Sequence, residues 1–129
     1  MKYILNYIWA IIWAIVMLIL LLMPGNEMPD LNKLHLFQGI DKVVHIGIFF
    51  IIALILYWES SLRHPNGEKK WNSLAKIVIC TVIFAFLTEE AQKHVSSRTA
   101  DKYDILADCI GIGMATASYI LLHRKTVKK

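Results

Sequence analysis

The sequence predicts an all-α integral membrane protein, a four-helix bundle with both termini in the cytoplasm. Hydrophobic residues make up 57% of its 129 residues, and the mean hydropathy is +0.50. This apolar content lies above that of typical soluble domains. The apolar residues gather in four runs that are separated by turn-forming segments. A chain of this length is expected to form one domain, which covers residues 1–129.

The first predicted helix covers residues 4–23. From Tyr7 to Met23 the chain carries no charge, and this run is long enough to cross a hydrocarbon core of roughly 30 Å. A cleaved signal peptide would have a shorter apolar region that ends at a cleavage site of small residues. The segment MPGNEMP follows the run and offers no such site. We therefore expect a retained transmembrane helix.

Three more helices are predicted over residues 42–58, 74–94 and 100–122. Each contains a long apolar run, such as VVHIGIFFIIALILYW in the first of them. The connections carry Pro, Gly, Asn and Ser, which favour turns. Together with the first run, these segments predict four membrane crossings.

Lys and Arg favour a cytoplasmic amino terminus. With that orientation, nine of the 14 Lys and Arg residues face the cytoplasm and five face outwards, as the positive-inside rule expects. The net charge of +4 comes largely from this inner rim, so it does not indicate a nucleic-acid partner. The acidic residues show the opposite bias, because only Glu59 and Glu68 fall on the inner side. The last three helices therefore have their ionisable ends in the outer leaflet.

Helical spacing places these ionisable residues on shared faces. Asp41 and His45 are four residues apart, and so are Asp104 and Asp108. A carboxylate deep in a membrane helix costs about 2.5–3.5 kcal/mol on insertion scales. A cationic side chain, a shared proton or a bound cation must compensate for that cost. We therefore expect a polar pocket where the helices meet.

Two segments carry a characteristic spacing of polar residues, DKVVHIGIF and EEAQKHVSSRTADKYDILADCIGIG. This spacing resembles the VanZ-like family of small bacterial membrane proteins, which has Asp-Lys-x-x-His at one helix and Glu-x-x-Gln, Arg, Asp, Asn and Gly further on. The matching residues are Asp41, Lys42, His45, Glu89, Gln92, Arg98, Asp104, Asp108 and Gly111. Asp108 stands where the family usually has Asn, so the charge balance differs at that position.

The resemblance implies a place in the bacterial cytoplasmic membrane and a role in the cell envelope. It links the protein to tolerance of teicoplanin-type glycopeptide antibiotics. It implies no particular reaction, so the chemistry must be argued from the residues.

Two functions of the predicted site are left open. As a binding site it would hold a polar lipid headgroup or a lipid-linked cell-wall precursor, with contacts from Asp41, Lys42, Gln92, Arg98 and Asp108. As an enzyme it would act on such a lipid, with Glu89, Asp104 and His45 as candidate catalytic residues. No cofactor is expected, although a divalent cation held by Glu89, Asp104 and Asp108 is an alternative.

A structural or adaptor protein is the third hypothesis. In that case Glu89, Arg98, Asp104 and Asp108 would form an ion network that only locks two helices together. Apolar residues often lock helices at a lower desolvation cost, and ionisable residues in membranes mark functional sites by default. Both arguments favour a working site. The sequence does not indicate an oligomeric state.

Overall fold

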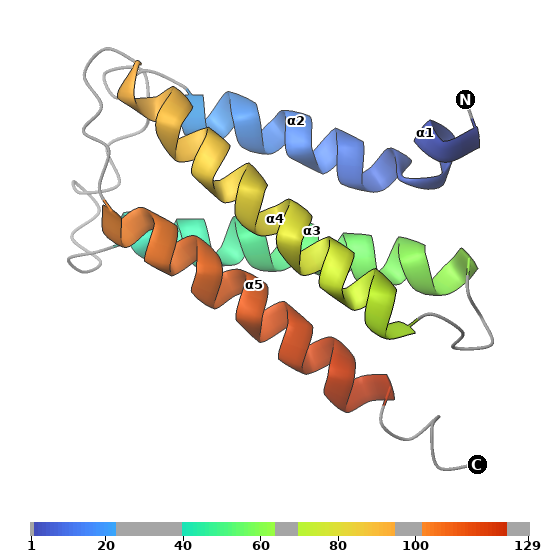
Figure 1. Ribbon diagram of the computed structural model, residues 1–129. Helices are drawn as coiled ribbons and strands as arrows, with labels where there is room; N and C mark the ends of the chain where they lie inside the picture. The colour runs from blue at the N-terminus through green and yellow to red at the C-terminus, as the bar shows by residue number, and fades with distance from the viewer. Residues whose placement is uncertain (1, 23–39, 64–69, 95–101, 124–129) are drawn as a thin grey trace.

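The computed structural model describes residues 2–22, 40–63, 70–94 and 102–123. All regular structure among these residues is helical (Figure 1). The helices are α1 (Lys2–Asn6), α2 (Ile8–Leu22), α3 (Ile40–Arg63), α4 (Lys70–Lys93) and α5 (Lys102–His123). The prediction of an all-α protein is therefore confirmed.

Helices α3, α4 and α5 are each long and apolar enough to cross a membrane. Their candidate spans are Lys42–Arg63, Trp71–Lys93 and Lys102–Leu122. At about 1.5 Å per residue, each span covers roughly the thickness of the hydrocarbon core. Their outward faces carry large apolar side chains, including Ile79, Phe86 and Met114, which are more than half exposed in the isolated chain. Exposed apolar faces of this kind are typical of contact with lipid or with another protein.

Hydroxyl groups within these helices are satisfied locally. Thr81 Oγ1 donates to the Ile77 carbonyl at 2.7 Å, and Thr116 Oγ1 donates to the Ile112 carbonyl at 2.8 Å. These bonds reach back one turn along the same helix, so neither hydroxyl needs water. Such local bonding suits a helix that lies in lipid.

The first apolar run folds differently from the single helix predicted over residues 4–23. It forms α1 and the 15-residue α2, with a break at Tyr7. The Tyr7 amide donates to the Ile4 carbonyl at 3.2 Å, and the Ile11 amide donates to the Tyr7 carbonyl at 2.9 Å. Both bonds end at Tyr7, so one closes α1 and the other opens α2. Helix α2 alone is about 22 Å long at 1.5 Å per residue, which makes it shorter than α3, α4 and α5.

A buried carboxylate lies beside this break. The backbone amide of Trp9, in the first turn of α2, donates to Glu59 Oε1 at 3.0 Å. Amides in a first turn lack partners within their own helix, so Glu59 acts as a cap supplied by α3. The sequence predicts that the second helix ends at residue 58, before Glu59. Helix α3 instead continues to Arg63, whose guanidinium lies 3.7 Å from the centroid of the Tyr7 ring.

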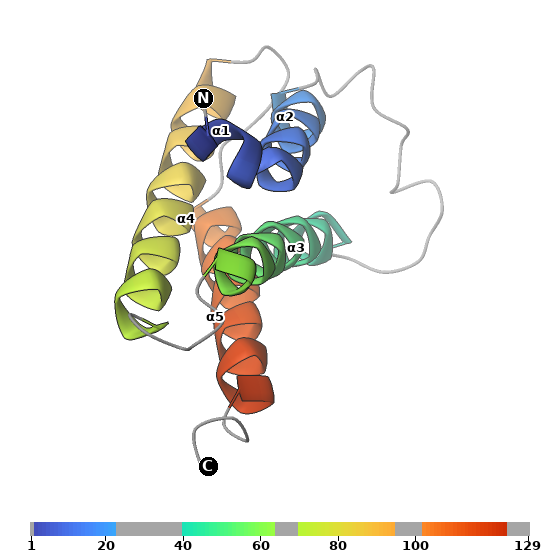
Figure 2. The same ribbon diagram turned by 90° about the vertical axis from the view of Figure 1, so that its right-hand side faces the viewer.

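Helices α3 and α4 lie at the centre of the bundle. Each contacts the other, and both contact α2 and α5. Figure 2 shows α2 and α5 on opposite sides of α3. The buried apolar residues form two clusters that fill the space between these helices. The larger cluster contains Met17, Leu21, Ile48, Phe49, Ile52, Ala85 and Ile112.

The most extensive helix contact joins α3 to α5, and Gly111 lies at its closest point. A Cβ atom at Gly111 would overlap the carbonyl oxygen of Ile46 and lie 3.1 Å from the Phe50 nitrogen. Glycine permits the two backbones to approach this closely.

The ends of the helices determine where polar groups meet. The end of α2, the start of α3, the end of α4 and the start of α5 gather at the left of Figure 1. The start of α1 and the end of α5 lie at the opposite end of the bundle. The ionisable ends of the last three helices therefore lie at the same end.

Candidate functional site

A group of buried ionisable residues occupies this end of the bundle. Lys42 and His45 come from α3, Glu89 from α4, and Asp104 and Asp108 from α5. The exposed fraction is 5% for His45, 4% for Glu89, 7% for Asp104 and 0% for Asp108. The structure thus brings together five of the eight site residues that the sequence predicts.

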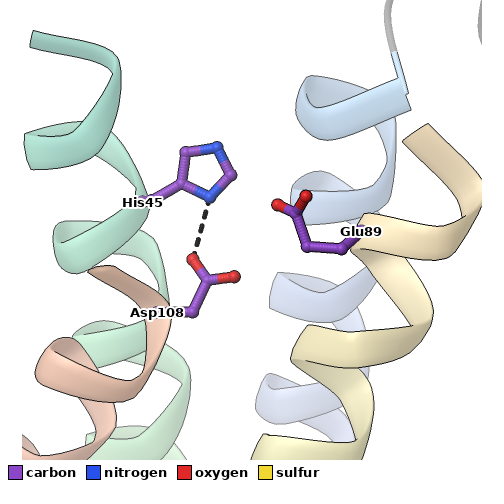
Figure 3. A group of neighbouring side chains, drawn as sticks. All are labelled: His45, Glu89 and Asp108. Atoms are coloured by element: carbon purple, nitrogen blue, oxygen red, sulfur yellow. Dashed lines mark hydrogen bonds and ion pairs between the residues drawn. The ribbon is translucent and has the colours of Figure 1, made fainter. Parts of the chain in front are cut away.

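Ion pairs and a hydrogen bond join α3 to α5. Lys42 Nζ donates to Asp104 Oδ1 at 2.6 Å. The second oxygen of this carboxylate, Asp104 Oδ2, lies 4.0 Å from His45 Nε2. His45 Nδ1 and Asp108 Oδ1 are 2.8 Å apart, within hydrogen-bond distance (Figure 3). Two residues one turn apart on α3 therefore contact two residues one turn apart on α5.

The close crossing at Gly111 makes these contacts geometrically feasible. Gly111 follows Asp108 by three residues, and Ile46, whose carbonyl faces Gly111, directly follows His45. An aspartate side chain is short, so it reaches a facing imidazole only when the helix backbones are close. Gly111, the last residue of the matching motif, thus also positions the polar site.

Glu89 faces the His45–Asp108 pair from α4 (Figure 3). One potential ligand atom from each of these three residues lies within 4.8 Å of the other two. Glu89 Oε1 and Asp108 Oδ2 are buried and have no hydrogen-bond partner within the described ranges. A buried oxygen without a partner has lost its hydration and gained nothing in return. The site therefore offers two unused acceptors in its interior.

Carboxylates outnumber cationic groups among the described residues of the site. Within the described ranges, Glu89, Asp104 and Asp108 face two cationic or titratable groups, the Lys42 ammonium and the His45 imidazole. Uncompensated charge is costly where water is absent. A proton, a metal ion or the donor group of a ligand is needed to balance these oxygens.

Gln92 has a structural partner. The sequence predicts it as a ligand-binding residue, but its Nε2 donates to the Leu21 carbonyl at 2.9 Å. That carbonyl belongs to the last turn of α2, where carbonyls lack partners within the helix. Gln92 therefore ties α2 to α4. No sequence signal reveals this contact, because its acceptor is a backbone atom on another helix.

Two predicted site residues are not placed by the structure. Arg98 and the side chain of Asp41 lie outside the described residues. Glu90, the neighbour of Glu89, points elsewhere, since it is exposed and pairs with Lys93 at 2.8 Å.

The His45–Asp108 pair has the form of an oriented imidazole. A carboxylate bonded to one ring nitrogen fixes the ring, and the other nitrogen is then available for proton transfer or ligand contact. The buried hydroxyl of Thr88 is already used, because its Oγ1 donates to the Ala85 carbonyl at 2.8 Å. The site thus contains proton-transfer groups, and Thr88 is not poised as a nucleophile beside them.

The fold and the site define a helical protein with transmembrane-length helices and a polar cluster buried between them. No protein-family model matches the chain. No solved structure matches it significantly. An uncharacterized protein of Schizosaccharomyces pombe is 30% identical over 89 residues, which are 69% of this chain and 52% of the relative. The chain thus spans about half the length of this curated relative.

Proposed function

We propose that the chain is a VanZ-like membrane protein that holds a polar lipid headgroup in the site between α3, α4 and α5. The main support is a pair of buried oxygens, Glu89 Oε1 and Asp108 Oδ2, which have no hydrogen-bond partner among the described residues. They lie at one end of helices that have transmembrane length. A bound group that donates hydrogen bonds to them would offset their desolvation cost.

The balance of charge favours a particular kind of headgroup. Hydroxyl or ammonium groups would donate to Glu89 and Asp108, while a phosphate would contact a cation at the edge of the site. Lys42 suits that role, because its side chain is 29% exposed. Arg98, which lies outside the described residues, is the second cation of the matching motif. The proposed ligand therefore combines a phosphate with an amine or a polyol.

The fungal relative bears on the choice of lipid. A ligand shared by fungal and bacterial membranes would suit both the fungal relative and the bacterial setting proposed for this chain. We therefore place a common phospholipid headgroup ahead of a lipid-linked cell-wall precursor. Processing of the headgroup would use the same site, with His45, Glu89 and Asp104 as proton-transfer groups.

The proposed setting is the cytoplasmic membrane of a bacterium. Helices α1 and α2 together would supply a fourth crossing, with both termini in the cytoplasm and the site in the outer leaflet. The distribution of Lys and Arg supports this orientation. The spacing of the polar motif supports a role in the cell envelope and in tolerance of glycopeptides such as teicoplanin.

A structural role is the second candidate, and one observation favours it. Lys42–Asp104 and His45–Asp108 both join α3 to α5, so they hold these helices together whether or not a ligand binds. Glu89 distinguishes the two functions, since no hydrogen bond or ion pair of its side chain is found within the described ranges, and Oε1 has no partner there.

The test replaces Glu89 by Gln in a glycopeptide-sensitive bacterium in which the wild-type protein confers tolerance of teicoplanin. Folded protein in the membrane, co-purified lipid and tolerance are measured together. We expect Glu89→Gln to remain folded, to lose lipid and to lose tolerance, because the amide removes the anionic acceptor. Glu90→Gln is the matched control, since Glu90 is exposed and pairs with Lys93. It should keep all three properties.

Two outcomes would contradict the proposal. Glu89→Gln protein that keeps its lipid and full tolerance would show that the buried carboxylate does not serve a ligand. Loss of Glu89→Gln from the membrane, together with full tolerance in a folded Asp108→Asn variant, would assign the cluster to scaffolding.

A further inference from the structure

We infer that His45, Glu89 and Asp108 form a binding site for one divalent metal ion of the Zn²⁺ or Mn²⁺ type. The three residues come from three different helices, α3, α4 and α5, and all are at least nine-tenths buried. Their potential ligand atoms lie within 4.8 Å of one another. Imidazole with two carboxylates is a donor set that suits these ions.

The unpartnered oxygens provide an independent observation. Glu89 Oε1 and Asp108 Oδ2 are buried acceptors without a hydrogen-bond partner in the part of the chain that the structure describes. Figure 3 shows the Glu89 carboxylate pointing from α4 towards the His45–Asp108 pair. Oxygen atoms that bind a metal ion have free lone pairs directed towards one point, and these two carboxylates could direct theirs in that way. A cluster satisfied by its own hydrogen bonds would not leave two oxygens unused.

The geometry selects a ligand set that differs from the carboxylates predicted from sequence. Asp104 is engaged by Lys42 at 2.6 Å, so its charge is already balanced. Its other oxygen lies 4.0 Å from His45 Nε2. When Nδ1 of an imidazole binds a metal, the other ring nitrogen commonly donates to a carboxylate. Asp104 is placed to accept that bond, so it would orient His45 without touching the ion.

Only small movements of the three side chains are required for their ligand atoms to coordinate one ion. Ligand atoms about 2.0–2.2 Å from a tetrahedral ion are roughly 3.4 Å apart, compared with the present limit of 4.8 Å. His45 Nδ1 and Asp108 Oδ1 would exchange their hydrogen bond of 2.8 Å for coordination to the shared ion. Three protein ligands leave a fourth position for water or for an oxygen of a ligand. With the ion bound, a headgroup would contact the site through this position and would no longer donate hydrogen bonds to Glu89 and Asp108.

The ion would also balance the charge of the described site. Two positive charges match the carboxylates of Glu89 and Asp108, while Lys42 matches Asp104. A neutral imidazole is the form that binds a metal. Each charge then has a counterpart in a region from which water is excluded, which lowers the desolvation cost.

The test uses the purified full-length protein in detergent, stripped of metal by a chelator and then titrated with Zn²⁺ or Mn²⁺ alone. Bound ion is quantified after removal of excess metal, and thermal stability is recorded in parallel. We expect one ion per chain and a higher melting temperature with the ion, because a ligand that binds only the folded state stabilises it.

Variants assign the ion to this site. Glu89→Gln and Asp108→Asn should each weaken binding by at least about 100-fold, since even changes to outer partners of metal ligands cost about 10–100-fold. Glu90→Gln and Glu59→Gln are the controls, one exposed beside Glu89 and one buried near the other end of α3. Both should bind like the wild type.

Absence of stoichiometric binding, or equal binding by folded Glu89→Gln and Asp108→Asn, would overturn the inference. Size-exclusion profiles identify a variant that has failed to fold, and Asp108→Asn preserves an acceptor for His45. The ion is tested without lipid, so the result is separate from the proposed function. Lipid loss in Glu89→Gln without metal binding by the wild type would defeat this inference alone.

Discussion

Lys42 and Asp104 form the most solvent-exposed contact of the site. The contribution of this ion pair to stability depends on how far its two side chains are shielded from water. The Lys42 side chain is 29% exposed and that of Asp104 is 10% exposed. Exposed ion pairs contribute about 0–1 kcal/mol, whereas breaking a buried pair costs about 3–5 kcal/mol. Because the Lys42–Asp104 pair is partly exposed, we expect the energetic cost of breaking it to lie between these two ranges.

Lys42→Met should therefore lower the free energy of unfolding by about 1–3 kcal/mol, because it leaves Asp104 buried beside two other carboxylates. Adding Asp104→Asn should restore part of that loss, since the amide removes the unbalanced charge. Denaturant unfolding in detergent, followed by tryptophan fluorescence, gives the free energies for the double-mutant cycle. Simple additivity of the two changes would show that the pair is not energetically coupled.

Asp108 departs from the residue that VanZ-like proteins usually carry. Asparagine would also accept a hydrogen bond from His45, so the bond at 2.8 Å does not require a carboxylate. What aspartate adds is a second anionic oxygen, and in this structure that oxygen has no partner among the described residues. Aspartate at position 108 thus supplies an oxygen ligand that the inferred metal site needs.

At the level of helices, the α3–α5 crossing controls the site through Gly111. Gly111→Ala should lower the free energy of unfolding by about 1–3 kcal/mol, because the added methyl group would overlap the Ile46 carbonyl. It should also separate His45 from Asp108 and weaken any ligand that the site holds. Unfolding in detergent and ligand binding are measured on the same preparation.

Gly113 provides a matched control on the same helix. A Cβ there meets nothing within 4 Å, so Gly113→Ala should be neutral or stabilise the helix by up to about 1 kcal/mol. Equal destabilisation by the two alanines would show that the loss does not come from contact with the Ile46 carbonyl, because Gly113 has no such contact. The close approach of α3 and α5 would then not determine the stability.

Much of the helical framework follows from sequence, and part of the site does too. Hydropathy predicts three of the helices, and spacing predicts that Asp104 and Asp108 share a face of α5. Periodicity gives a face without saying which partner faces it. The assignment of Lys42 to Asp104 and His45 to Asp108 depends on how the helices cross. How α3 and α5 cross is determined by tertiary packing, which the spacing of residues within one helix does not reveal.

The errors in the first predicted helix have a similar origin. The run around Tyr7 is apolar throughout, so nothing in its composition indicates a break between α1 and α2. The acceptor for the Trp9 amide comes from Glu59, 50 residues away. Glu59 follows the apolar run of α3 in sequence and therefore looks like a residue of the membrane surface. Only the packing of α2 against α3 buries it.

On the scale of the whole molecule, the polar site and the described chain ends lie at opposite ends of the bundle (Figure 1). The start of α1 and the end of α5 share one end, as expected for a chain that crosses a membrane an even number of times. Whether the number of crossings is three or four depends on whether α2 crosses the membrane, because α2 is shorter than the three candidate spans.

Reporter fusions should therefore place both termini on the cytoplasmic side. A reporter at each terminus, one active only inside the cell and one active only outside, gives the side directly. We expect both ends to report the cytoplasm, with Lys2 and the basic carboxyl-terminal segment RKTVKK retained there. Opposite signals from the two termini would mean that α1 and α2 do not cross, and that the chain spans the membrane three times.

Helix α2 is secured at its two ends by side chains from later helices. Glu59 of α3 accepts from the Trp9 amide, and Gln92 of α4 donates to the Leu21 carbonyl. Synthesis runs from the amino terminus, so α2 is made before either cap exists. The Trp9 amide and the Leu21 carbonyl therefore gain these two partners only after α3 and then α4 have been made. The order of translation is thus also the order in which the two ends of α2 are fixed, first by α3 and then by α4.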